Sequence, residues 1–296
     1  MDSKTENNTQ KTRQQQEIEQ NQRILDNLKR IRHKLVVMSG KGGVGKSTVA
    51  ANLAMSLAGA GKRVGLMDID IHGPNIPKML GIDDKRIIAS ANGIEPIMAH
   101  ENLKVMSMAL LLDSKDRAVI WRGPMKTGLI RQFLSDVNWG ELDYLIMDLP
   151  PGTGDEPLSI AQNIPTGSHA VIVTTPQEVS ILDVGKSLDF ARQLNMKIVG
   201  IIENMSGFAC PHCGENIDLF GKGGGEILAV REGVPFLGSI PLDPAIAISG
   251  DSGSGFMAQQ VDSVGGKAFL EVVTNIRGFI GDAKPGGERQ PDSIPS

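Results

Sequence analysis

Residues 40 to 47 read Gly-Lys-Gly-Gly-Val-Gly-Lys-Ser and match the phosphate-binding pattern G-x-x-x-x-G-K-[ST]. Glycine allows the backbone N–H groups of such a loop to approach anionic oxygens closely. The apolar run 34–38 predicts a buried strand before the loop, and residues 47–60 predict a packed helix after it. In this context we expect Lys46 to contact the β- and γ-phosphates of a nucleotide, and the Ser47 hydroxyl to ligate Mg²⁺. The predicted nucleotide-binding loop comprises Gly40, Lys41, Gly42, Gly43, Val44, Gly45, Lys46, Ser47 and Thr48.

Carboxylates end two further apolar runs. Asp68 and Asp70 end the run 63–70, and Asp148 ends the run 144–148. Ligands collect at the carboxyl edge of a parallel sheet, where an aspartate suits Mg²⁺ coordination. We predict that Asp148 serves the metal directly or through water, that Asp68 lies near the metal, and that Asp70 orients the attacking water. The residue types leave the roles of Asp68 and Asp70 interchangeable, and strand-end capping is the alternative role of this pair.

Cys210 and Cys213 are the only cysteines among the 296 residues, and they stand at metal-ligand spacing. Zinc and four-cysteine iron–sulfur sites need four ligands, so two thiolates make half a coordination shell. Across a two-fold axis each residue faces its own copy, and two chains together would supply four cysteines. A thioredoxin-like redox pair and a structural zinc bridging two chains remain as alternatives.

Lys41 directly follows the first glycine of the loop, where its side chain points away from its own phosphate site. A solvated surface charge is the simplest interpretation of this residue. With this second lysine the loop resembles the deviant Walker A class of P-loop proteins. The resemblance implies that Lys41 reaches the partner's nucleotide across a two-fold dimer and stabilises charge that develops during phosphoryl transfer. We therefore assign Lys41, Lys46 and Asp70 to catalysis.

The chain as a whole resembles the Mrp/ApbC family of iron–sulfur cluster carrier ATPases over residues 34–281. The matching segments are 40–47, 68–77, 121–125, 131–134, 143–155, 203–206 and 208–214. The resemblance implies that Asn204 hydrogen-bonds the adenine and that Asp243 lines the same end of the pocket. A strand-end turn residue is the alternative interpretation of Asn204. Residues 1–33 lack the additional four-cysteine motif of some relatives, because they contain no cysteine.

Strand-like and helix-like segments alternate along the chain and predict an α/β fold. We expect a doubly wound, mostly parallel sheet of the deviant Walker A P-loop NTPase type. Residues 1–33 are predicted to be a polar extension, partly disordered and then forming a short helix from about residue 17. Residues 34–281 form the predicted P-loop ATPase domain, and 282–296, rich in Pro, Gly and charge, the predicted disordered tail.

The balance of charged residues limits the kinds of partner that we expect the chain to bind. Lysine and arginine number 30, aspartate and glutamate number 34, and the formal net charge is −4. Without a basic block or an aromatic-interleaved basic stripe, we expect no nucleic-acid partner. The sequence has no apolar run of membrane-spanning length and no cleavable signal, so we expect no membrane partner and a cytoplasmic location. That compartment keeps thiols reduced.

These features together predict a homodimeric, ATP-binding and slowly ATP-hydrolysing carrier. It is expected to use ATP and Mg²⁺, to hold an iron–sulfur cluster of the 4Fe-4S form between two chains, and to pass it to apo-proteins. A MinD/ParA-like nucleotide-gated positioning scaffold is one alternative, but it gives the cysteine pair no purpose. A second alternative is an electron-donating reductase similar to the nitrogenase iron protein. The C-x-x-C spacing argues against it, because that protein takes its cluster ligands from separate segments. A zinc- or nickel-handling metallochaperone ATPase is a variant of the carrier.

Overall fold

The computed structural model describes residues 3–70, 73, 75–90, 93–111, 123–154, 157–158, 161–164, 167–209, 213 and 215–282. Outside this description lie residues 71–72, 74, 121–122, 155, 210–212 and 214 of the matching segments, which include Cys210, and the predicted tail from 283 onward.

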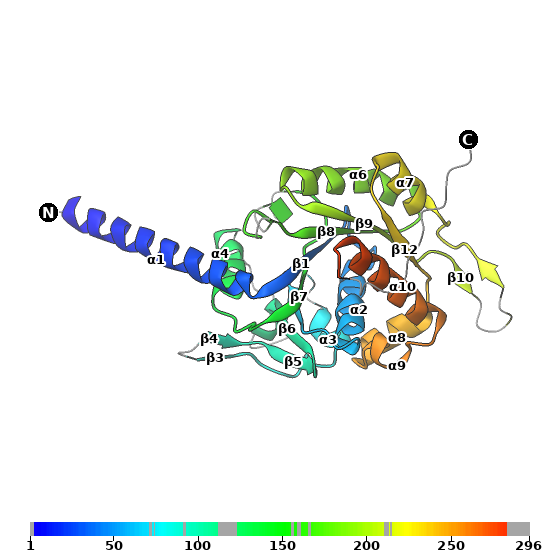
Figure 1. Ribbon diagram of the computed structural model, residues 1–296, viewed down its shortest axis with the longest axis horizontal. Coiled ribbons are helices and arrows are strands. Elements are labelled where there is room, and N and C mark those ends of the chain that lie inside the picture. The colour runs from blue at the N-terminus through cyan, green and yellow to red at the C-terminus, as the bar shows by residue number, and fades with distance from the viewer. Residues whose placement is uncertain are drawn as a thin grey trace.

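One large sheet carries the fold, with its strands in the order β12-β9-β8-β1-β7-β2-β6-β5 (Figure 1). Neighbouring strands are parallel except for β5, which pairs antiparallel with β6. This order confirms the predicted doubly wound, mostly parallel sheet. The strands are β1 Ile31–Met38, β2 Val64–Asp68, β5 Ile97–His100, β6 Leu103–Ser107, β7 Leu142–Asp148, β8 His169–Thr174, β9 Lys197–Asn204 and β12 Phe236–Ile240.

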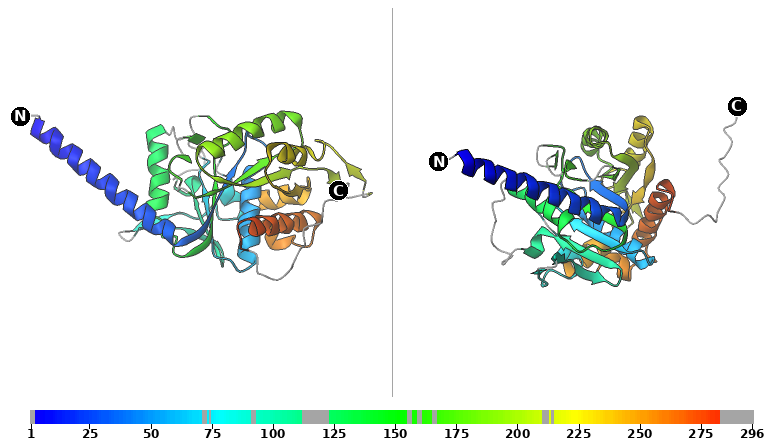
Figure 2. Two further views of the ribbon diagram at one scale, coloured as in Figure 1. Left: turned by 45° about the horizontal axis from the view of Figure 1, so that its top comes forward. Right: turned by 60° about the vertical axis from the view of Figure 1, so that its left-hand side comes forward.

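Alternation along the central strands divides the apolar side chains between two cores. In β1, Val36 and Met38 belong to one core, and Leu35 and Val37 belong to the other. Successive strand residues point to opposite faces, so a strand buried on both sides reads as a continuous apolar run. Helices therefore cover both faces of the sheet (Figures 1 and 2).

The first core is covered by α1 Ser3–Lys29, α4 Gly123–Ser135, α6 Glu178–Gln193 and α7 Gly224–Glu232. The second core is covered by α2 Lys46–Gly59, α3 Ile76–Met79, α9 Phe256–Gln259 and α10 Val264–Phe279, and α8 Pro244–Ser252 lies on the same side. Two small hairpins, β3 Ile88–Ser90 with β4 Gly93–Glu95 and β10 Phe208–Ala209 with β11 Asn216–Ile217, and the 3₁₀ turn η1 Met108–Leu111 complete the described elements. Among these helices none is long and apolar enough to cross a membrane.

The N-terminal segment differs from the expected disordered start and short helix. Helix α1 spans Ser3–Lys29 without a break and extends beyond the body of the molecule (Figures 1 and 2). No glycine or proline interrupts residues 1–29, and Gln, Glu, Lys and Arg are good helix formers. The C-terminal part of the helix docks on the body: Ile24 and Leu28 are buried, and Asn27 donates hydrogen bonds to the carbonyls of Leu134 and Ser135 at the end of α4.

Both boundaries of the predicted P-loop domain shift outward. Strand β1 begins at Ile31 rather than at residue 34, because the buried Ile31 pairs with Leu142 of β7. Asp282, predicted to open the disordered tail, is buried and accepts a hydrogen bond from Tyr144. A charged residue that satisfies a buried polar partner belongs to the folded body.

Candidate nucleotide and metal sites

Lys46, Ser47 and Asp148 form a compact group where the phosphate-binding loop meets β7. Lys46 Nζ lies 2.6 Å from Asp148 Oδ1, and the Ser47 hydroxyl donates to Asp148 Oδ2 at 2.5 Å. Strand pairing explains the contact, because β1 leads into the loop and Val37 of β1 is the register partner of Asp148. Gly45 precedes α2 with φ of 79°, a left-handed backbone that favours glycine. The structure thus brings the predicted site residues Lys46, Ser47 and Asp148 together at one edge of the sheet.

Asp68 lies beside Asp148 in the register of β2 and β7 and is fully buried. It accepts hydrogen bonds from the Ser107 hydroxyl at 2.8 Å and from the Asp70 backbone N–H at 3.2 Å. Burial raises the pKa of Asp68 well above its usual value, and the neighbouring Asp148 carboxylate raises it further. Burial also raises the pKa of Asp148, against the opposing charge of Lys46.

The donor set of this edge suits a divalent cation. The buried Asp148 carboxylate contacts the Ser47 hydroxyl, and the buried Asp68 lies beside Asp148 in the sheet register. Oxygen ligands of this kind are those that Mg²⁺ prefers. A bound cation would offset the mutual repulsion that raises the pKa of Asp68. The residues present therefore fit the predicted metal.

Asp70 continues from Asp68 toward the same edge and is 9% exposed. Its Oδ1 accepts a hydrogen bond from the Gly73 backbone N–H at 3.3 Å. The carboxylate thus shapes the start of the turn after β2, while the backbone N–H of Asp70 contacts the Asp68 carboxylate.

Lys41 sits half-buried at the start of the loop, and its backbone carbonyl accepts a hydrogen bond from the Ser39 hydroxyl at 2.9 Å. Within the described part of the chain its ammonium forms no ion pair. Gly40 before it is fixed by packing, because a Cβ at this position would collide with the backbone of Asp183 in α6. The first glycine of the loop therefore allows α6 to approach.

Asn204 holds the loop from the other side. Its side chain is buried at the end of β9, and Nδ2 donates to the Val44 carbonyl at 2.9 Å. Gly45 is required here for space as well as conformation, because an added Cβ would collide with Asn204 Nδ2. The sequence predicts an adenine contact for Asn204 but gives no signal for this bond to the loop.

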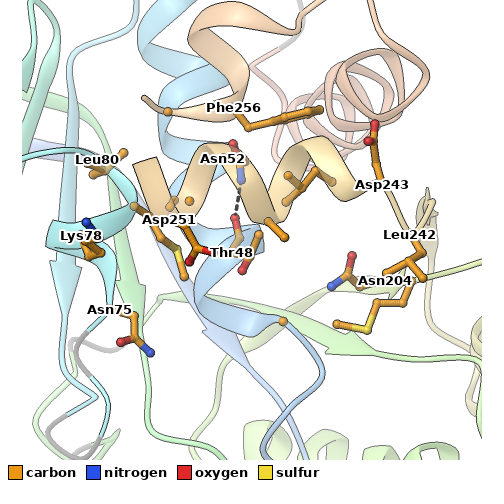
Figure 3. A pocket seen from close by; sticks show the side chains of 18 of the residues that line it. Thr48, Asn52, Asn75, Lys78, Leu80, Asn204, Leu242, Asp243, Asp251 and Phe256 are labelled. Carbon is orange, nitrogen blue, oxygen red and sulfur yellow. Dashed lines mark hydrogen bonds between the residues drawn. The ribbon is translucent and has the colours of Figure 1, made fainter. Parts of the chain in front are cut away.

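A pocket of about 420 Å³ continues from the loop between α2, α3, α8 and α9 (Figure 3). Gly45, Thr48, Asn204 and Asp243 line it, which brings four of the predicted nucleotide-binding residues to one cavity. Asp243 also caps α8, because its Oδ1 accepts a hydrogen bond from the Ala245 N–H at 2.9 Å. The pocket has further polar lining residues that the sequence did not indicate: Asn52, Asn75, Lys78 and Asp251.

Cys213 lies in the connection between β10 and β11, and its thiol is exposed and free. Phe208 pairs with Ile217 and Ala209 with Asn216, so this connection is the tip of a hairpin. The hairpin stands at the end of the molecule away from α1 (Figure 1). Among the described residues, which exclude Cys210, no group of three or more His, Cys, Asp or Glu side chains is placed to hold a metal ion. We call residues 206–225 the cysteine segment.

The phosphate-binding loop between β1 and α2, with carboxylates at the ends of β2 and β7, defines a P-loop nucleotide-binding protein. The family model described as "ParA: NUBPL iron-transfer P-loop NTPase" matches residues 30–277, and the chain belongs to this family.

Similar proteins share most of the chain. A protein from Methanocaldococcus jannaschii named iron-sulfur cluster carrier protein is 57% identical over 235 residues, covering 79% of this chain and 81% of that protein. A protein of the same name from Saccharolobus solfataricus is 51% identical over 249 residues, 84% of each chain. The solved structure of a nucleotide-binding protein from Archaeoglobus fulgidus in complex with ADP, with cobalt found, has a TM-score of 0.71 and 43% identity, covering 79% of this chain and 91% of that one.

Proposed function

We propose that this chain is an ATP-binding iron–sulfur cluster carrier that works as a homodimer. The observation that carries the proposal is the exposed thiol of Cys213 on a hairpin that follows directly from the strand ending in the nucleotide-site residue Asn204. The names of the relatives at 57% and 51% identity support the same cargo.

The nucleotide part of the proposal rests on the group around Asp148. Lys46 and the loop backbone would hold the phosphates, and the pocket lined by Thr48, Asn204 and Asp243 would hold the nucleoside. Ser47, Asp68 and Asp148 would hold Mg²⁺, which neutralises charge on the phosphates when it is bound. ADP in the Archaeoglobus fulgidus structure supports adenine nucleotide as the ligand.

Hydrolysis would need two further residues. Asp70, held next to Asp68 by the backbone of the β2 turn, would orient the attacking water. Lys41, which has no ion-pair partner in the described part of its own chain, would reach the nucleotide of the partner subunit. Its role would be to stabilise the charge that develops on the transferred phosphate.

The cluster is the cargo. Cys210 and Cys213 of two chains would supply four thiolates, and an exposed hairpin tip would let the cluster leave to an apo-protein. A compartment that keeps thiols reduced, such as the cytoplasm, would suit this chemistry.

Anaerobic reconstitution of the full chain with iron and sulfide tests the proposal. The wild-type chain is expected to develop the visible absorption of an iron–sulfur cluster, and Cys213→Ala is expected to lose it while still binding ADP. Glu215→Ala, an exposed substitution in the same hairpin, is the control and should load normally. Full cluster loading by Cys213→Ala, or tight zinc binding without absorption by the wild type, would contradict the proposal.

A further inference from the structure

Glu203, beside Asn204 near the end of β9, is a fully buried carboxylate with three hydrogen-bond donors. Its Oε1 accepts from the Ser206 hydroxyl at 2.5 Å and from the Gly223 N–H at 2.9 Å. Its Oε2 accepts from the Gly225 N–H at 2.6 Å. A buried carboxylate is tolerated only when donors of this kind replace water.

These three donors lie at the two ends of the cysteine segment. Ser206 opens the segment after β9, and Gly223 and Gly225 close it where α7 begins. The chain therefore leaves Glu203, carries the hairpin with Cys213, and returns to the same carboxylate. The N-terminus of α7 adds a favourable partial positive charge. Gly225 fits this approach, because an added Cβ would lie 3.1 Å from both Glu203 Cβ and Oε2.

The next residue, Asn204, hydrogen-bonds the phosphate-binding loop on the opposite face of the sheet. Successive residues of a strand point to opposite faces, so Glu203 faces α7 whereas Asn204 faces the loop. Asn204 Nδ2 donates to the Val44 carbonyl, and Glu203 accepts from both ends of the cysteine segment. Two adjacent side chains of β9 thus hold the phosphate-binding loop and the cysteine segment.

We propose that Glu203 is a positioning residue for the metal site: its carboxylate closes the cysteine segment and sets where Cys213 is presented. This proposal rests on the proposed cluster-carrying function. A role in core stability alone would lower the free energy of unfolding without a local effect on the segment. A positioning role instead requires that the loss of hydrogen-exchange protection is concentrated in the cysteine segment and that the cluster is released faster.

The variant Glu203→Gln tests this, because the amide keeps the size of the side chain but places an NH₂ group against a backbone N–H. Tyr144→Phe is the matched control, since it removes another buried hydrogen bond, to Asp282, at the other end of the strands. Amide hydrogen exchange on the full chain without metal is the first measurement. In Glu203→Gln, exchange at residues 206–209 and 223–225 is expected to rise by about tenfold or more, the effect of one lost buried hydrogen bond. In Tyr144→Phe these amides should exchange as in the wild type.

The second measurement is the rate at which reconstituted chains lose the cluster to a chelator. Glu203→Gln is expected to release it about tenfold faster, whereas Tyr144→Phe releases it at the wild-type rate. ADP affinity should match the wild type in both variants, because the Asn204 contact is retained. Ser206→Ala, which removes a single donor, should show the same local change at smaller amplitude. It replaces Glu203→Gln in both measurements if Glu203→Gln does not fold.

Unchanged exchange of the segment in Glu203→Gln would overturn the proposal. Faster exchange with cluster release at the wild-type rate would also overturn it, because the hydrogen bonds of Glu203 would then not affect the metal site. A wild-type chain that takes up no cluster would defeat the proposed function instead. In that case hydrogen exchange still decides whether Glu203 closes the cysteine segment.

Discussion

Lys46 and Asp148 form a buried ion pair, with Nζ and Oδ1 separated by 2.6 Å and neither side chain more than 5% exposed. The lysine that would bind phosphate is therefore already positioned by the carboxylate that would serve the metal. An ammonium has three donors, so Lys46 can retain Asp148 and still donate to a phosphate oxygen. The pair links the stability of the fold to the nucleotide site.

The first prediction concerns this pair. Lys46→Ala leaves Asp148 buried without its cation and should lower the free energy of unfolding by about 3–5 kcal/mol, besides abolishing ADP binding. The double variant Lys46→Ala/Asp148→Asn should recover much of the stability and still bind no ADP. Denaturant unfolding and calorimetric titration measure the two effects. Equal stability of Lys46→Ala and the double variant would contradict the role of the pair.

The second prediction concerns Lys41. If its ammonium acts on the partner's nucleotide, Lys41→Ala should keep the affinity for ADP but lower the rate of ATP hydrolysis by roughly 10²-fold. Lys29→Ala, at an exposed lysine that pairs with Asp26 in α1, is the control and should hydrolyse ATP at the wild-type rate. Phosphate release is the measurement, and an unaffected rate in Lys41→Ala would show that Lys41 takes no part in catalysis.

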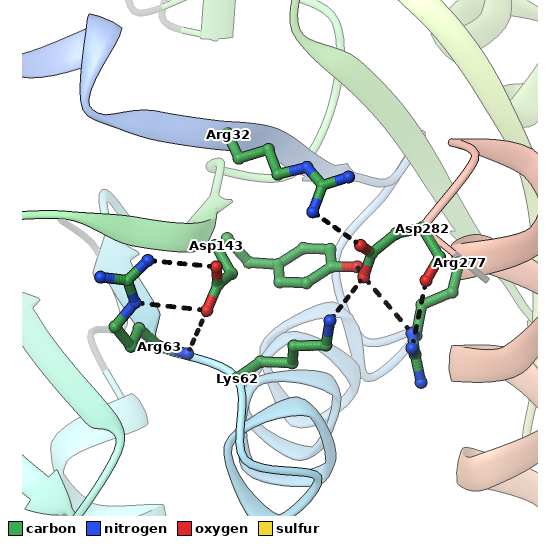
Figure 4. Close-up of polar contacts among 7 residues, drawn as sticks. Arg32, Lys62, Arg63, Asp143, Arg277 and Asp282 are labelled. Carbon is green, nitrogen blue, oxygen red and sulfur yellow. Dashed lines mark hydrogen bonds and ion pairs between the residues drawn. The ribbon is translucent and has the colours of Figure 1, made fainter. Parts of the chain in front are cut away.

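The third prediction concerns Asp282, which ties the end of α10 to the sheet (Figure 4). Its carboxylate accepts from the Tyr144 hydroxyl at 2.5 Å and pairs with Lys62 at 3.1 Å and Arg277 at 3.5 Å. Asp282→Asn should therefore lower the free energy of unfolding by about 3 kcal/mol. Asp189→Asn, which breaks an exposed pair with Arg192, should leave the unfolding midpoint unchanged. A midpoint for Asp282→Asn equal to that of the control would show that the contacts add no net stability.

The fourth prediction concerns pH. His33 and His169 lie on neighbouring strands with ring centroids 6.4 Å apart, and burial lowers the pKa of each from 6.5. Nearby positive charge, from Arg32 at His33 and Lys197 at His169, lowers both further. The unfolded chain therefore binds protons that the folded chain does not, and stability should fall as pH drops below about 6.5.

The double variant His33→Gln/His169→Gln should flatten that dependence, whereas His100→Gln, at an exposed position, should not. Thermal unfolding between pH 5 and 8 is the measurement. A second loss is expected at lower pH. Although burial alone would raise the pKa of Asp282, the Tyr144 hydrogen bond and Lys62 hold it below its usual value of 3.8. Its stabilisation is therefore lost only in stronger acid. If the double histidine variant kept the wild-type dependence of stability on pH between pH 5 and 8, the role of His33 and His169 would be contradicted.

Local pattern was enough to predict the sheet and the phosphate site. The glycines and lysine of the loop specify their own backbone, and parallel pairing of β1, β7 and β2 brings Asp68 and Asp148 to the loop by register. The ends of neighbouring parallel strands meet at one edge whatever the intervening sequence.

Contacts between distant segments were not predictable in this way. Asn204 bonds to Val44 across 160 positions, and Glu203 bonds to glycines that follow the hairpin. Neither pair shares a periodic pattern that a single sequence reveals. The boundaries differ for a related reason: polar composition predicted a disordered start before a short helix in residues 1–33 and a disordered tail from residue 282, whereas α1 runs from Ser3 to Lys29 and Asp282 is held by tertiary ion pairs.

Native mass spectrometry of the anaerobically reconstituted full chain tests the central claim most directly. The account predicts a dimer that carries one four-iron cluster, and a Cys213→Ser chain that carries none. A monomer that retains its full complement of iron and sulfide would contradict the shared site between two chains.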